Sequence, residues 1–313
     1  MDILYAVVVV IGLCIFESIA SIDNAILNAD ILSTMGDKAR RWFLIWGILI
    51  AVFLVRGFLP WIIIWASSPE IGFIDALLVT FTDNSAAVSA MDATAPYLLM
   101  FGGVFMAFLF LHWLFAEKKC CLVPGERFLT EQAPWFYAIA AGMLLVIVWL
   151  SLENDPYLAF AAVAGSTLFF IMHGFRITAD KKSAELGMSA KSDMSKLALL
   201  LVIDATFSID GVIGAFAFTF SVPLIFIGCG IGAIIVRELT IRNIENIKRY
   251  VYLKNGAMYA ILFLSGIMVL EGFQIHVPIW IAPLAMVVIV GAFWFASVVR
   301  LRGDEGKTIP PLT

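Results

Sequence analysis

Long apolar stretches recur along this chain, and they limit its fold more than any other feature of the sequence. They occur from residue 3 to residue 299, and spanning the hydrocarbon of a bilayer takes roughly 20 predominantly apolar residues per helix. Of the 313 residues, 62% are hydrophobic and only 14% are charged. A water-soluble core of this chain length cannot bury that much apolar surface. We therefore predict an all-α, polytopic membrane protein whose main partner is the lipid bilayer.

Hydropathy and helix-breaking residues predict about nine transmembrane helices. Their ranges are 3–31, 42–66, 97–116, 134–151, 157–175, 197–220, 222–236, 256–272 and 279–299. Polar residues interrupt 72–91, which we interpret as an interfacial or re-entrant element. The predicted organisation is a first repeat over 1–117 with an interfacial insert at 67–96, two inserted helices and a cytoplasmic hinge loop over 118–196, a second, inverted repeat over 197–272, and a final helix with a cytoplasmic tail over 273–313.

Basic residues gather in every other predicted connection. Lysine and arginine occur in 36–41, 118–127, 176–196, 237–254 and 300–307, whereas 67–70, 151–156 and 271–278 contain none. Under the positive-inside rule this pattern places the N-terminus outside and the C-terminus in the cytoplasm, as expected for a multi-pass protein of the inner cell membrane. The net charge of −4 and the short basic loops do not indicate nucleic-acid binding.

Two similar acidic motifs lie in apolar segments, one in each half of the chain. Residues 17–26 and 204–213 share the pattern acid-x3-Ser-Ile-Asp-[Asn/Gly]-x-Ile, and the following helices repeat Gly-x8-Arg. The helix with the first motif is predicted to run inward and the helix with the second to run outward. Inverted repeats of this kind are typical of secondary transporters, whose sites lie near the bilayer midplane where the repeats meet.

The residue types in the motifs indicate a site for a hard cation. On an unbroken helix the second acid of each motif lies about 120° round from the first and ~9 Å along. Residues 21–24 and 208–211 are good helix caps, so we predict unwinding there, which would bring the carboxylates together. The predicted metal site consists of Glu17, Asp23, Asn24, Asp204 and Asp210, supported by Ser21, Ser208, Arg56 and Arg237.

Carboxylate, amide and hydroxyl oxygens are the ligands that Mn²⁺, Ca²⁺ and Mg²⁺ prefer. Each intramembrane acid costs ~2.5 to 3.5 kcal/mol on insertion scales, which a bound cation or proton would compensate. The prediction is therefore a transporter without enzymatic activity or prosthetic group, which carries a divalent cation such as Mn²⁺, Ca²⁺ or Mg²⁺, coupled to protons or Na⁺. Three alternatives stay open: a structural network of protonated or capping carboxyls, an intramembrane aspartyl-type hydrolase, for which a Gly-x-Gly-Asp sequence is missing, and an exporter of a small organic cation or amino acid.

At the two acidic motifs the sequence resembles the TerC superfamily. The stretches 16–29, 46–56, 101–116, 202–219 and 228–240 are most similar to its branch called DUF475. Related families include manganese exporters and tellurium-resistance proteins, so the resemblance implies export of Mn²⁺ or a similar cation, with the five predicted ligands as the matching motif positions. The usual TerC core has about seven helices, so the two helices within 134–175 are extra, and His112 stands where an acid is common in this branch.

Overall fold

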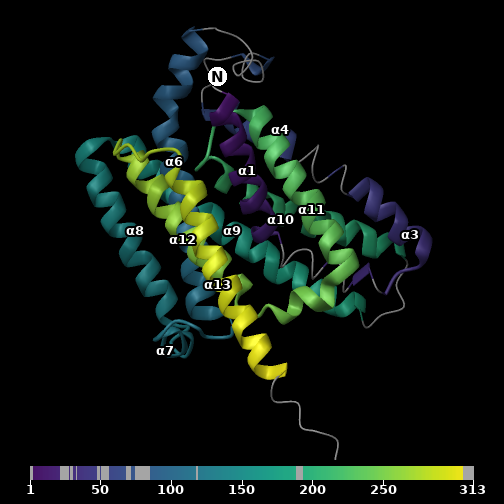
Figure 1. The fold of residues 1–313 in the computed structure, drawn as a ribbon. Coiled ribbons are helices and arrows are strands. Elements are labelled where there is room, and N and C mark those ends of the chain that lie inside the picture. The colour runs from purple at the N-terminus through teal and green to yellow at the C-terminus, as the bar shows by residue number, and fades with distance from the viewer. Residues whose placement is uncertain are drawn as a thin grey trace, which may run out of the picture.

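The computed structural model describes residues 3–21, 28, 31–32, 34–47, 50, 56–67, 72–74, 85–117, 119–187 and 193–305. Each regular element in these ranges is a helix (Figure 1). The elements are α1 (Ile3–Ala20), α3 (Asp37–Trp42), the π-helix η1 (Phe43–Gly47), α4 (Arg56–Ser67), α6 (Ser85–Ala116), α7 (Glu126–Thr130), α8 (Trp135–Asn154), α9 (Pro156–Gly187), α10 (Asp193–Ala215), α11 (Val222–Arg249), α12 (Leu253–Gly272) and α13 (Ile281–Glu305).

Six described helices are long and apolar enough to cross a membrane. They are Ile3–Ala20, Asp92–Ala116, Trp135–Asn154, Pro156–Thr178, Leu253–Gly272 and Ile281–Arg302, and Val222–Val236 is a shorter apolar segment. These helices confirm the predicted class, an all-α, multi-pass membrane protein. The total of nine spans stays a prediction, because the segment 42–66 and the side chains of α10 are described only in part, and Val222–Val236 is shorter than a full span.

Helices α6, α9 and α11 extend furthest beyond the ends that hydropathy predicted. Helix α6 begins at Ser85 and contains Pro96, so residues 85–91 of the predicted interfacial element form one helix with the candidate span Asp92–Ala116; residues 75–84 of that prediction lie outside the described part. Helix α9 continues to Gly187, so most of the predicted hinge loop, residues 176–196, is helical. Helix α11 continues to Arg249. Hydropathy marks where a chain leaves the hydrocarbon, whereas lysine, glutamate and alanine continue a helix into water.

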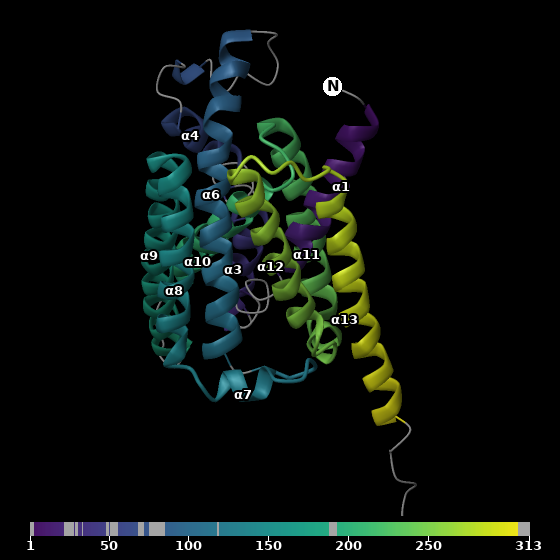
Figure 2. The same ribbon diagram turned by 90° about the vertical axis from the view of Figure 1, so that its left-hand side faces the viewer.

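Helices α6 and α12 form a closely packed central pair, with α8 and α9 on one side of it and α13 on the other (Figure 2). Helices α8 and α9 pack on α6, α13 packs on α12 and α1, and α1 packs along α11. A Cβ added at Gly103 would lie 2.8 Å from Val269 Cγ2. Gly103 therefore allows α6 and α12 to lie in close contact, as small residues do in membrane proteins. The start of α1 and the end of α13 lie at opposite ends of the bundle (Figures 1 and 2).

Polar contacts fix the connection after α6 to the start of α12. Glu126 is buried and accepts hydrogen bonds from Tyr259 Oη at 2.8 Å and from the backbone N–H of Leu122 at 2.8 Å. Lys254 Nζ lies 2.7 Å from Glu117 Oε2. Although burial raises the pKa of Glu117, the charge of Lys254 and its hydrogen bond outweigh this effect and hold that pKa below its ordinary value. These contacts join the end of one central helix to the beginning of the other.

Candidate cation site

Glu17 lies at the contact between α1 and two helices of the second half of the chain. Its exposed fraction is 0%. A Cβ at Gly211 of α10 would lie 2.6 Å from Glu17 Oε2, and a Cβ at Gly232 of α11 would lie 2.7 Å from Glu17 Cβ. Ser21 Oγ donates a hydrogen bond to Glu17 Oε1. The glycines thus leave room for this carboxyl group, which faces the protein interior as expected of an intramembrane acid.

Helix α1 ends close to the position where unwinding was predicted. The helix stops at Ala20 and Ser21 lies in a turn. Before the turn, Ser18 Oγ donates a hydrogen bond of 3.4 Å to the carbonyl oxygen of Gly232, a further link between α1 and α11. The predicted ligands Asp23 and Asn24 lie outside the described residues.

The second motif does not unwind, and that part of the prediction is wrong. Helix α10 continues without a break through residues 208–211. Ser208 is only 2% exposed, and Gly211 is the residue against which Glu17 packs. Tertiary packing on both sides therefore holds these cap-forming residues inside a helix, because helix propensity is weaker than packing.

An unbroken α10 divides the two acids of the second motif between different faces. Asp204, Ser208 and Gly211 follow the helical spacing of four and three residues, so they share one face, whereas Asp210 lies about 120° round. Asn28 Nδ2 donates a hydrogen bond of 3.2 Å to Asp204 Oδ1. Glu17 and Asp204 thus mark the two ends of a polar line, ~10 Å long by helix rise.

Glu17 and Asn28 contact α10 in an order opposite to that of their own positions in the chain. Glu17 meets α10 at Gly211 and Asn28 meets it at Asp204, so rising numbers in the first half face falling numbers in the second. We name the set Glu17, Ser21, Asn28, Asp204 and Ser208 the polar line. It brings together four of the nine residues predicted for the site and adds Asn28, which follows the first motif by only a few residues.

Asp210 points away from the polar line toward a helix that was not predicted to contribute. Its carboxylate forms an ion pair with Arg176 of α9, and the two side chains are 13% and 20% exposed. Sequence reasoning missed Arg176 because it was assigned to a loop. The helix-forming residues that follow Arg176 could have revealed that α9 continues. Arg56 begins α4 and Arg237 lies in α11, but the described side chains do not include theirs.

The polar line contains oxygen atoms that are suited to a hard cation. In the described part of the chain, Asn28 Oδ1 and Ser208 Oγ are buried without a hydrogen-bond partner, as is Asp210 Oδ1. Such atoms are rare in folded proteins and often mark ligand sites. The described residues contain no cluster of three or more histidine, cysteine, aspartate or glutamate side chains. Complete coordination by the chain would therefore also use hydroxyl, amide or carbonyl oxygens, or the undescribed Asp23 and Asn24.

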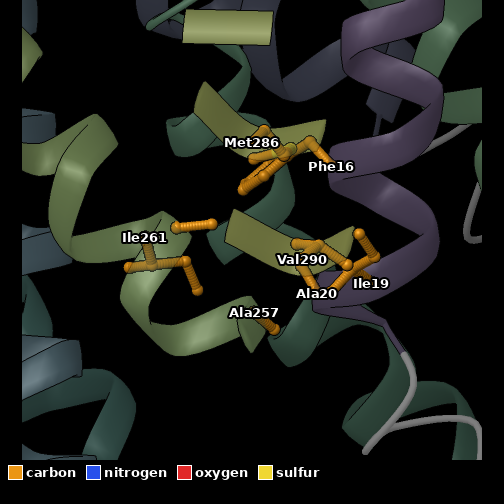
Figure 3. A pocket seen from close by; sticks show the side chains of 8 residues that line it. Phe16, Ile19, Ala20, Ala257, Ile261, Met286 and Val290 are labelled. Carbon is orange, nitrogen blue, oxygen red and sulfur yellow. The ribbon is translucent and has the colours of Figure 1, made fainter. Parts of the chain in front are cut away.

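Two other features lie near these helices. The rings of His112 on α6 and His173 on α9 have centroids 4.2 Å apart, a contact that their spacing did not indicate. A cavity between α1, α12 and α13 is lined by eight apolar residues, among them Phe16, Ile261 and Met286 (Figure 3). Its volume of about 10 Å³ is at most enough for one water molecule. Neither its size nor its lining suits a hydrated cation.

Apolar helices around buried acids define this protein as a multi-pass helical membrane protein with charged groups inside its apolar layer. The model of a family described as "Protein of unknown function (DUF475)" matches residues 22–304, and the chain belongs to that family. No curated protein and no solved structure matches the chain.

Proposed function

We propose that this protein is a secondary transporter that moves a divalent metal cation along the polar line by alternating access. Mn²⁺ is the first candidate for the cargo and Ca²⁺ the second. The observation that carries the proposal is the position of Glu17. This residue of the apolar helix α1 is completely buried and packs against α10 and α11 of the second half. A carboxylate in the hydrocarbon layer is costly, and such residues typically line ion pathways.

The packing of the helices supports an inverted repeat and, with it, a relationship to the TerC superfamily and its manganese exporters. Helix α1 packs on α11 and α10 packs on α4, while α6 and α12 pack on each other. The first helix of each half thus contacts the second helix of the other half, and the third helices form a pair. A two-fold axis in the membrane plane would produce this pattern, and rocking of two such halves gives alternating access.

The arrangement of the helix ends supports the proposed orientation. Helix α7, which begins at the end of the basic connection 118–127, and the end of α13 are found at the same end of the bundle (Figures 1 and 2). The start of α1 lies at the opposite end. We propose that α7 and the C-terminus are cytoplasmic, that the N-terminus is outside, and that the protein resides in the inner cell membrane, where export would protect the cytoplasm from excess metal.

Reconstitution in proteoliposomes with a Mn²⁺-sensitive dye inside tests this proposal. Glu17→Gln and Asp204→Asn keep the side-chain size and remove the charges, so both should lose most of the Mn²⁺ flux of the wild type. Glu153→Gln is the matched control, because Glu153 lies exposed near the end of α8. Imposed proton and Na⁺ gradients identify the coupling ion. A wild type without cation flux, or one that Asp204→Asn matches, would reject the proposal.

A further inference from the structure

We propose that Arg176 sets the valence selectivity of the cation site by cancelling the charge of Asp210. This inference rests on the proposed function, because it concerns which cation the polar line accepts. The acidic motif of the second half contributes two carboxylates, Asp204 and Asp210, but only Asp204 faces the first half. With Arg176 in place, the charge of Asp210 is cancelled and the potential along the polar line is less negative. A less negative potential favours a divalent cation over a trivalent one.

The ion pair is placed where a charge has a strong effect. Asp210 and Arg176 come from α10 and α9, and both side chains are largely buried. A guanidinium stays protonated in proteins, so the cancelling charge is permanent. His173 lies one turn before Arg176, and its ring contacts His112, which faces Glu117 at 3.9 Å. Of Arg176, His173 and His112, Arg176 is the residue that forms an ion pair with an acid of the second motif.

Asp210 is positioned to act on the polar line once its partner is removed. It lies ~9 Å along α10 from Asp204, and its Oδ1 atom is buried without a hydrogen-bond partner among the described residues. At an effective dielectric constant of about 20, one charge at about 10 Å changes the binding energy of a trivalent ion more than that of a divalent ion. The difference corresponds to about a tenfold change in the ratio of the two affinities. Water and salt would screen a surface arginine far more strongly.

Binding of Tb³⁺ and Mn²⁺ to the purified full-length protein in detergent tests the inference without measuring transport. Tb³⁺ luminescence gives the dissociation constant of the trivalent ion, and displacement of Tb³⁺ by Mn²⁺ gives that of the divalent ion. Arg176→Gln should shift the ratio of the two constants toward Tb³⁺ by about tenfold. The double variant Arg176→Gln with Asp210→Asn should return the ratio to the wild-type value, because its pair is neutral.

Two further variants make the result decisive. Arg127→Gln is the matched control, because Arg127 forms an exposed pair with Glu131 at 3.6 Å, and its ratio should equal that of the wild type. Asp210→Asn leaves Arg176 uncompensated and should shift the ratio toward Mn²⁺, which also provides the test if Arg176→Gln does not fold.

The outcomes separate this inference from the proposed function. If the wild type binds Mn²⁺ and neither Arg176→Gln nor Asp210→Asn changes the ratio, the pair only joins two helices and the inference is overturned, while the proposed function stands. If neither ion binds to the wild type or to any variant, both are rejected. Opposite shifts in the two single variants, with recovery in the double variant, support the inference.

Discussion

Replacing Gly211 with alanine should impair cation transport while leaving the protein nearly as stable as the wild type. The new Cβ would lie 2.6 Å from Glu17 Oε2, and ordinary contact begins at 3.4 Å, so the carboxylate must move by 3.4 − 2.6 = 0.8 Å. The far end of a flexible side chain can make this shift at a cost of about 1 kcal/mol. Alanine returns about 1 kcal/mol by its higher helix propensity, so the two effects nearly cancel in the free energy of unfolding.

The displacement should matter far more for function. A misplacement of about 1 Å can cost roughly 100-fold in a process that depends on positioned groups, so we expect Mn²⁺ flux to fall by roughly 10- to 100-fold. The assay combines flux in proteoliposomes with thermal unfolding in detergent. Gly266→Ala on α12 is the control, because a Cβ there would have no heavy atom within 4 Å. Unchanged flux in Gly211→Ala would refute the reasoning that the position of the Glu17 carboxylate controls transport.

Three further predictions concern stability. Gly232→Ala should lower the free energy of unfolding by about 1–3 kcal/mol in denaturant titrations, because its Cβ would lie 2.7 Å from the backbone oxygen of Cys14; a value equal to that of Gly266→Ala would show that α1 and α11 can separate freely. Tyr259→Phe should cost roughly 1.5–3 kcal/mol in the same assay, because it removes the 2.8 Å hydrogen bond to buried Glu126, and a neutral effect would contradict that role. Glu117→Gln should flatten the acid limb of a plot of melting temperature against pH. The pKa of Glu117 is below its ordinary value of 4.5, so its contribution is complete above that value and is lost as pH falls through the lower folded pKa; equal acid limbs in wild type and variant would disprove this.

Much of the bundle follows from sequence because membrane helices obey simple rules. The predicted span 134–151 corresponds to α8, and the following turn is marked by Asp155, whose Oδ1 accepts a hydrogen bond of 2.9 Å from the backbone N–H of Tyr157. An aspartate cap followed by Pro156 is a common helix start. The burial of Glu17 was also predictable, since an acid in a span must face the interior.

The geometry of the second motif could not be read from local sequence. Ser208, Asp210 and Gly211 favour a cap, but contacts from distant segments keep them in a helix. The same distant packing gives Asp210 a partner on α9, so the predicted convergence of all the acids at one centre is replaced by the polar line and a separate ion pair. Residue types and spacing therefore identified the acids, whereas only the packing of α9, α10 and α1 shows which of them share a face.

Diffraction from crystals grown with Mn²⁺, measured at the manganese absorption edge, tests the central claim most directly. We predict an anomalous peak between α1 and α10, with oxygen atoms of Glu17 or Asp204 at about 2.0–2.6 Å, the range of carboxylate bonds to hard cations. The peak should be absent from crystals of Glu17→Gln with Asp204→Asn. A wild-type protein with no manganese between these helices, or with manganese bound only at surface acids, would contradict the account.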